Sequence, residues 1–253
     1  MIARLKAEDR PALFALLGQD PLLGGRIATA FDCWGGRDSV CGFYRIDDTA
    51  ALLVQGGGAL LCGALNPEQA KELSVFLRFA GVGVLTARTP SLPGRQTRLA
   101  ALCRPAGSAA QPKPLPPGAV IQTEPALWPV RQAGFFAADN PDGWYADACA
   151  RRTRGLAAIW TVELGGAPAA TAGLYSLRDA PFGGYLTAVE TLPRYRGRGY
   201  ASALVCALAA RFGETLPLRL ICAPALLPFY RRAGFLPEDP VWEIRLDETQ
   251  KKD

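Results

Sequence analysis

The chain has 253 residues and a mass of 27.0 kDa, with 49% hydrophobic residues, 20% charged residues and a net charge of +5. This length suits two compact domains, and the composition excludes a disordered chain. No apolar run reaches the roughly 18 residues that a membrane-spanning helix needs, so we expect a soluble, cytoplasmic protein without a membrane partner.

The first hundred residues alternate helical and extended segments. A helix is predicted to start at Asn66-Pro67-Glu68, because proline is favoured at the first helical position. The hydrophobic spacing predicts helices over 7–17 and 22–31 and strands over 40–46, 51–55, 59–62 and 82–86. This order is of the α/β type.

A proline-rich stretch follows. Residues 104–118 read RPAGSAAQPKPLPPG, with five prolines in 15 residues and no hydrophobic period. Such a stretch favours an extended, semi-rigid backbone. We therefore expect an N-terminal domain over 1–103, a linker over 104–118 and a C-terminal domain over 119–253.

The C-terminal domain repeats the element order of the N-terminal one, although the two sequences have few residues in common. Helices are predicted near 125–138 and 144–154, over 199–211 and near 226–233. Strands are predicted over 156–163, 169–176, 185–192, 218–222 and 241–246. We expect two structurally similar halves.

The most informative stretch is Leu192–Ser202, LPRYRGRGYAS, between a predicted strand and the helix that follows it. Gly197 and Gly199 let the backbone approach a ligand closely, and the start of a helix offers unpaired N–H groups. Arginines at positions 194, 196 and 198 add positive charge. The stretch predicts a pyrophosphate cradle; the alternative is an arginine-rich surface turn that only begins a helix.

Two motifs carry a resemblance to the GNAT superfamily of N-acyltransferases. Arg196–Ala201, RGRGYA, fits the acyl-CoA pyrophosphate signature Arg/Gln-x-x-Gly-x-Gly/Ala, and Phe229–Phe235, FYRRAGF, resembles the second signature. The resemblance covers 119–246. It implies an α/β fold with a mixed, mostly antiparallel sheet flanked by helices, and a degenerate GNAT-like N-terminal half. Ala223 departs from the family, which often has asparagine there to contact pantetheine.

The same resemblance implies acetyl-CoA as the acyl donor. Coenzyme A would lie between the strand that ends at Leu192 and the strand 218–222, with the backbone of Val189 and Thr191 along pantetheine. The residues implied to hold the pyrophosphate through their backbone amides are Arg196, Gly197, Arg198, Gly199, Tyr200 and Ala201.

No metal is expected. The chain has no histidine, which also excludes Ser/His and Cys/His nucleophile pairs, and its seven cysteines form no C-x-x-C pair. Most of these cysteines sit in apolar segments and are interpreted as small buried residues.

Tyr230 matches the family's general acid, which protonates the departing thiolate; its alternative role is packing in an amphipathic helix. Cys222 is a second candidate for the acid.

The sequence indicates the general base less clearly than the acid. Glu190 is the carboxylate nearest in sequence to the reaction centre, although strand alternation places it opposite Val189 and Thr191. Glu163, Asp179 and a water relay are the alternatives.

The resemblance implies an N-acetyltransferase that acts on a small amine or an amino-acid-like acceptor, which Phe135–Tyr145 would contact. A non-catalytic acyl-CoA sensor with the same fold is the alternative. A nucleic-acid partner is not expected, because the arginines are not combined with exposed aromatic residues on a recognition element. The sequence is compatible with a homodimer and does not determine the oligomeric state.

Overall fold

The computed structural model describes residues 1–35, 40–109, 112–136, 140–175 and 182–246, and the chain divides into two compact units. The units interleave along the sequence. Unit 1 comprises Met1–Ala101, Ile221–Ala225 and Pro237–Asp253, and unit 2 comprises Leu102–Leu220 and Leu226–Leu236.

Unit 1 is built on a mixed sheet whose strands follow the order β1-β2-β3-β4-β5-β13-β6. Its strands are β1 (Ile2–Arg4), β2 (Gly42–Ile46), β3 (Ala50–Gln55), β4 (Gly58–Gly63), β5 (Val84–Ala87), β6 (Arg95–Arg104) and β13 (Val241–Arg245). Its helices are η1 (Ala7–Asp9), α1 (Arg10–Leu17), α2 (Pro21–Trp34) and α3 (Pro67–Phe79).

The core of unit 1 joins α3 to the sheet. Leu73 and Leu77 of α3 are fully buried and pack in one cluster with Leu61 of β4 and Leu85 of β5. Leu73 and Leu77, one helical turn apart, thus lie on the face that α3 buries. Strands β4 and β5 run parallel, as expected for a strand–helix–strand unit.

The last strand of the chain, β13, lies inside the sheet of unit 1. It runs antiparallel to β5 on one side, with Ile244 opposite Leu85, and antiparallel to β6 on the other, with Ile244 opposite Gln96. Gly94 fits this close packing because it has no Cβ, which would lie 2.2 Å from the carbonyl oxygen of Arg245.

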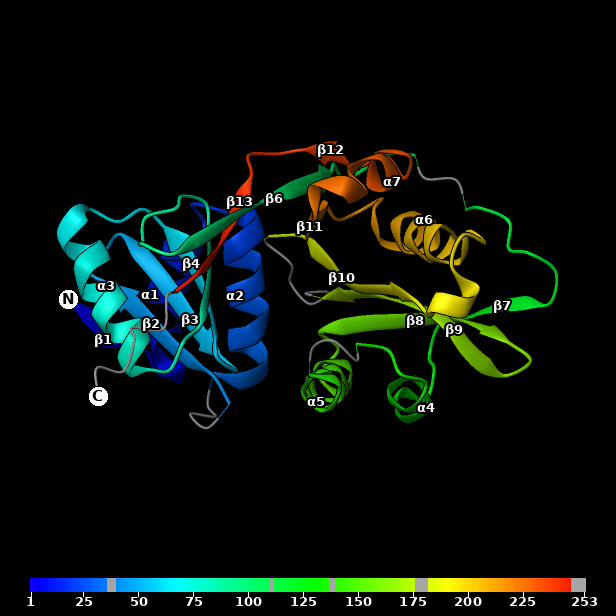
Figure 1. Cartoon of the computed structure of the whole chain (residues 1–253), viewed down its shortest axis with the longest axis horizontal. Coiled ribbons are helices and arrows are strands. Elements are labelled where there is room, and N and C mark those ends of the chain that lie inside the picture. Colours follow the sequence, from blue (N-terminus) through cyan, green and yellow to red (C-terminus); the bar gives the residue numbers. More distant parts are fainter. Residues whose placement is uncertain (36–39, 110–111, 137–139, 176–181, 247–253) are drawn as a thin grey trace. The chain divides into compact units, whose positions relative to one another are not determined.

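Unit 2 is built on strands in the order β11-β10-β9-β8-β7. They are β7 (Ala119–Gln122), β8 (Ala157–Leu164), β9 (Ala167–Tyr175), β10 (Gly184–Thr191) and β11 (Leu218–Cys222), and a two-residue strand β12 (Leu236–Pro237) follows. The helices are α4 (Leu127–Gln132), α5 (Pro141–Thr153), η2 (Pro193–Tyr195), α6 (Tyr200–Phe212), η3 (Pro224–Leu226) and α7 (Leu227–Arg231). Within unit 2, α6 covers one face of the sheet and α4 and α5 cover the other (Figure 1).

The predicted fold class is confirmed: the fold is mixed α/β, mostly antiparallel, with helices on the sheet. Short edge strands β1 and β7, and β6 and β12, have no counterpart in the sequence-based prediction. The first half of β6, Arg95–Arg98, is polar and exposed, so no hydrophobic pattern reveals it. The helix expected near 125–138 is shorter, because Gly134 takes a left-handed conformation with φ of 91° soon after α4 ends.

The domain division at 1–103, 104–118 and 119–253 stays a prediction, and the compact units differ from it in two respects. Arg104, at the start of the expected linker, is the last residue of β6 and is almost fully buried. The C-terminal strand β13 belongs to unit 1. In the part of the chain that is described, no helix has the length and apolarity needed to span a membrane.

Candidate active site

Strand β10 breaks its pairing with β9 near the end that leads to the arginine–glycine loop. Thr187 pairs with Gly173, but the next paired residue is Glu190, opposite Thr171. The irregularity is a β-bulge at Ala188, whose φ of 51° is left-handed although it is not a glycine. The bulge takes Ala188 and Val189 out of the regular pairing with β9.

On its other side β10 separates from β11. The two strands pair in parallel at Gly184 with Leu218 and at Tyr185 with Arg219, and the register goes no further along the described residues. Beyond Tyr185 the backbone of β10 therefore makes no pairing with β11. Val189 and Thr191, the residues expected to face pantetheine, lie on this diverging part of β10.

The loop after β10 leads into an uncapped helix. Gly197 and Gly199 have φ of 76° and 84°, and Gly199 is the residue that precedes the first turn of α6. No side chain caps this N-terminus, and no atom lies within 4 Å of the position that a Cβ on Gly199 would occupy. The first N–H groups of a helix have no partner within it, so this end presents donors and a positive dipole to solvent.

Three arginines lie in the loop that leads to this helix start. Arg194 and Arg198 lie over the ring of Tyr195, with guanidinium carbons 4.9 and 5.9 Å from its centroid. The Nε of Arg196 donates a 3.1 Å hydrogen bond to the carbonyl oxygen of Thr191 and so ties the loop to the end of β10. The loop is thereby both positively charged and anchored.

The residue at the end of β10 is fixed by the core. Leu192 is buried in a cluster with Val130 of α4 and Phe135, and Tyr195 packs against the same cluster. Because the arginine–glycine loop follows Leu192 in the sequence, the packing of Leu192 in this cluster fixes where the loop begins.

A pocket of about 420 Å³ opens beside the bulge, and it is lined by Phe136, Trp144, Thr187, Ala188, Val189 and Glu190. The rings of Phe136 and Trp144 lie 4.6 Å apart, tilted by 38°, and form one wall. The carboxylate of Glu190 accepts a 2.8 Å hydrogen bond from the backbone N–H of Phe136. A carboxylate and an aromatic wall in one pocket are suited to an amine.

Strand alternation places Glu190 on the face opposite Val189. Both residues nevertheless line the pocket, together with Thr187 and Ala188, so the whole irregular stretch of β10 borders it. The other carboxylates considered do not line it: Glu163 lies on β8, paired through the sheet with Val120, and Asp179 lies outside the described residues.

Tyr230 lies in the short helix α7, is 6% exposed, and contacts the rings of Phe229 and Phe235 at centroid distances of 4.8 and 5.9 Å. Its ring is thus held firmly. Cys222 is buried at the end of β11, and burial raises the pKa of its thiol to about 11. A thiol with that pKa holds its proton at neutral pH, which keeps it unreactive.

The remaining described residues offer no metal site, since no three Cys, Asp or Glu side chains gather in a group that could hold a metal ion. Assignment of the loop, Glu190 and Tyr230 to the site stays a prediction of the sequence signals. These signals do not identify the bulge, because an alanine with positive φ leaves no mark in the sequence.

Residues 123–235 match the model of the Acetyltransferase (GNAT) family. No curated protein matches the chain. Among known structures, a tandem GNAT protein from the clavulanic acid biosynthesis pathway has a TM-score of 0.63 at 12% identity, with 99% of each chain covered. A GCN5-related N-acetyltransferase from Kribbella flavida has a TM-score of 0.62 at 16% identity, with 90% of this chain and 96% of the other covered. A Drosophila protein has a TM-score of 0.67 at 12% identity, with 98% of this chain and 99% of the other covered. At these identities the structural likeness shows the fold alone.

Proposed function

Since residues 123–235 form a domain of the GNAT acetyltransferase family and the chain has the fold of two-unit GNAT proteins, we propose that it is an acetyl-CoA-dependent N-acetyltransferase acting on a small amine. Family and fold support acyl transfer in general. The acetyl donor and the amine acceptor are our proposal.

The observation that carries the proposal is the uncapped start of α6. Gly199 has a left-handed conformation, no side chain caps the N-terminus of α6, and three arginines lie in the loop before it. This loop follows β10, whose edge toward β11 is unpaired beyond Tyr185. Backbone donors at a helix start suit a diphosphate, and the glycines allow it to approach closely. The residues present therefore fit coenzyme A.

In this proposal the backbone amides from Arg196 to Ala201 hold the pyrophosphate. The backbone of Val189 and Thr191, on the edge of β10 that β11 leaves unpaired, lies along the pantetheine arm, although the Thr191 carbonyl already accepts a hydrogen bond from Arg196. Acetyl-CoA supplies the acyl group in activated form, as a thioester.

The acceptor amine occupies the pocket beside the bulge. Its apolar part packs on Phe136 and Trp144, and Glu190 takes the proton from the ammonium, either directly or through water. The hydrogen bond from the Phe136 amide holds the Glu190 carboxylate in place and leaves its other oxygen for the amine. Tyr230 holds the proton that the departing thiolate requires.

A non-catalytic acyl-CoA sensor is the alternative from another class. An assay with the full chain separates the two: acetyl-CoA is incubated with a panel of amines and free thiol is measured, with calorimetry of CoA binding alongside. We expect amine-dependent thiol release. CoA binding without thiol release for any amine supports the sensor, and no CoA binding at all contradicts both.

A further inference from the structure

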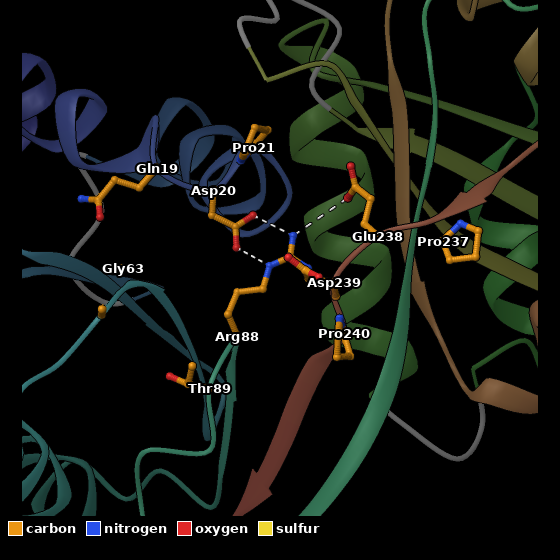
Figure 2. Close-up of a pocket in the computed structure, with 11 residues that line it drawn as sticks. Gln19, Asp20, Pro21, Gly63, Arg88, Thr89, Pro237, Glu238, Asp239 and Pro240 are labelled. Carbon is orange, nitrogen blue, oxygen red and sulfur yellow. Dashed lines mark hydrogen bonds and ion pairs between the residues drawn. The ribbon is translucent and has the colours of Figure 1, made fainter.

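A second and larger cavity lies wholly within unit 1, with a volume of about 1040 Å³ (Figure 2). Its walls come from the start of α2, the ends of β4 and β5 and the segment that leads into β13. The parallel pairing of β4 with β5 ends at Leu60 and Thr86, so the cavity lies where these two strands have separated. Ligand sites in sheets of this kind often lie at the carboxyl ends of parallel strands.

An ion pair forms one wall of the cavity. Asp20 is 8% exposed, and its carboxylate accepts from Nε of Arg88 at 2.6 Å and from Nη2 at 3.0 Å. Burial alone would lower the pKa of Arg88, but the hydrogen bond and charge of Asp20 raise it, so Arg88 stays charged. Figure 2 shows that the guanidinium of Arg88 faces the carboxylates of both Asp20 and Glu238.

The positive groups around this cavity are already paired within the protein. Besides Asp20, Arg88 donates through Nη1 to the carbonyl oxygen of Asp239, and its Nη2 lies 3.9 Å from Glu238. The start of α2 is closed as well, because Asp20 accepts from the N–H groups of Leu22 and Leu23. Arg88, the one cationic side chain among the described residues that line the cavity, is therefore already engaged, which disfavours a phosphate or carboxylate ligand.

The charge balance of the cavity is negative. Its lining residues carry three carboxylates, of Asp20, Glu238 and Asp239, against the single guanidinium of Arg88. Asp239 is exposed, and a carboxylate accepts several hydrogen bonds at once. Pro21, Pro237 and Pro240 add rigid apolar surface around these charges. The volume is of the order of a small-molecule site.

We propose that this cavity of unit 1 binds a small organic cation, an amine or a guanidine, whose charge lies against Asp239 and Glu238 and whose hydrocarbon part packs on the prolines. This site is separate in composition from the pocket of unit 2, with which it shares no residue. It gives unit 1 a ligand of its own, although the described residues of that unit include no arginine–glycine loop at a helix start.

The test uses the full chain, isothermal titration calorimetry and agmatine, which carries both a guanidinium and an ammonium group. Butane-1,4-diol and succinate serve as neutral and anionic probes of similar length. We expect agmatine to bind, neither of the other probes to bind, and the affinity to fall as sodium chloride is added.

The double variant Glu238→Gln/Asp239→Asn should weaken agmatine binding at least tenfold while CoA binding, as a sign of intact folding, is kept. Asp48→Asn is the matched control, since Asp48 is exposed in the same unit and pairs only with Arg45 among the ion pairs of the described residues. Glu190→Gln distinguishes the two pockets and should leave agmatine binding unchanged.

Three results would overturn the proposal: no agmatine binding, succinate binding as tight as that of agmatine, or agmatine binding that is lost in Glu190→Gln but kept in the double variant. The last would place the cation in the acceptor pocket of unit 2. None of these readouts depends on turnover, so the proposal on unit 1 can fail while the proposed acetyltransferase activity stands, and the reverse.

Discussion

At the scale of single residues, the proposed CoA site depends on backbone conformation more than on side-chain chemistry. Gly199 has open space where a Cβ would lie, so a larger residue there meets no steric clash. What a substitution disturbs is the left-handed φ of 84°. Side chains other than glycine, asparagine and aspartate adopt this region only at a cost of roughly 1–2 kcal/mol.

We therefore predict that Gly199→Val weakens CoA binding at least tenfold, because a shifted backbone loses charge-assisted hydrogen bonds that are worth about 1.5–3 kcal/mol each. Gly199→Asn is the matched control: asparagine tolerates left-handed backbone and should keep most of the affinity. Calorimetry of both folded variants measures the difference. Equal affinity in Gly199→Val and the wild-type chain would remove the loop from the CoA site.

A second prediction concerns Tyr230. Its ring is buried against Phe229 and Phe235, and Tyr230→Phe keeps that packing while it removes the hydroxyl proton. If Tyr230 is the general acid, turnover should fall by about 10²–10⁴-fold while CoA affinity is unchanged. Steady-state thiol release and calorimetry measure the two quantities. An unchanged turnover number would show that Tyr230 acts only in packing.

The residues of the site differ in how far the sequence reveals them. Gly197 and Gly199 are recognisable because only glycine takes their conformation freely, and the expected loop is where the structure has it. Ala188 is not recognisable, because its positive φ is imposed by the pairing of β10 with β9 rather than by its own side chain. That Val189 and Glu190 line one pocket could not be predicted either, because strand alternation places them on opposite faces.

At the scale of elements, two helices in corresponding positions begin in opposite ways. Helix α6 starts without a cap, whereas α3 starts with a reciprocal pair: the side chain of Asn66 accepts from the N–H of Gln69 at 2.9 Å, and that of Gln69 accepts from the N–H of Asn66 at 2.9 Å. Gln69 also donates to Asp47 at 2.9 Å. The start of α3 is therefore closed to an anion, and the start of α6 is open.

This contrast yields a prediction about stability. Asn66→Ala should destabilise the protein by about 1 kcal/mol, since it leaves the N–H of Gln69 without its partner, and it should not change CoA affinity. Asn66→Ser keeps a capping oxygen and is the control. Urea unfolding measures the first effect and calorimetry the second. A loss of CoA affinity in Asn66→Ala would mean that α3 takes part in binding.

Element prediction succeeds where a hydrophobic period is strong, as for β11, whose bounds match the sequence-based strand 218–222. It fails for short edge strands such as β1 and β7, which alternate over too few residues to form a pattern. The pairing of β13 with β5 and β6 was also beyond reach, because neighbours in a sheet that are far apart in sequence leave no local signal.

At the scale of the whole molecule, our proposals assign a different ligand to each unit. Among the described residues, an arginine–glycine loop at an uncapped helix start occurs in unit 2 alone. We predict that the full chain binds one CoA, as measured by the stoichiometry of calorimetric titration. A ratio of two would contradict the assignment of CoA to unit 2 alone.

The full chain is the appropriate sample for that measurement, because unit 2 includes residues well before Pro117. Leu102–Arg104 belongs to unit 2, and the N–H of Gly107 donates to the carbonyl oxygens of Gly213 and Glu214 just after α6, at 3.0 and 3.1 Å. A fragment that starts at Pro117 lacks all of these contacts. Its failure to bind CoA would reflect lost structure rather than a misplaced site.

The position of β13 has a consequence for how the protein is made. Translation delivers β5 and β6 early, but the strand that lies between them, Val241–Arg245, is synthesised only after the whole of unit 2. Domains usually complete their folding in the order in which they leave the ribosome. Unit 1 therefore has to wait for Val241–Arg245 with the facing edges of β5 and β6 unpaired, which favours association between nascent chains. A chain cut short before Val241 is therefore expected to lose the structure of unit 1, although most of that unit is synthesised first.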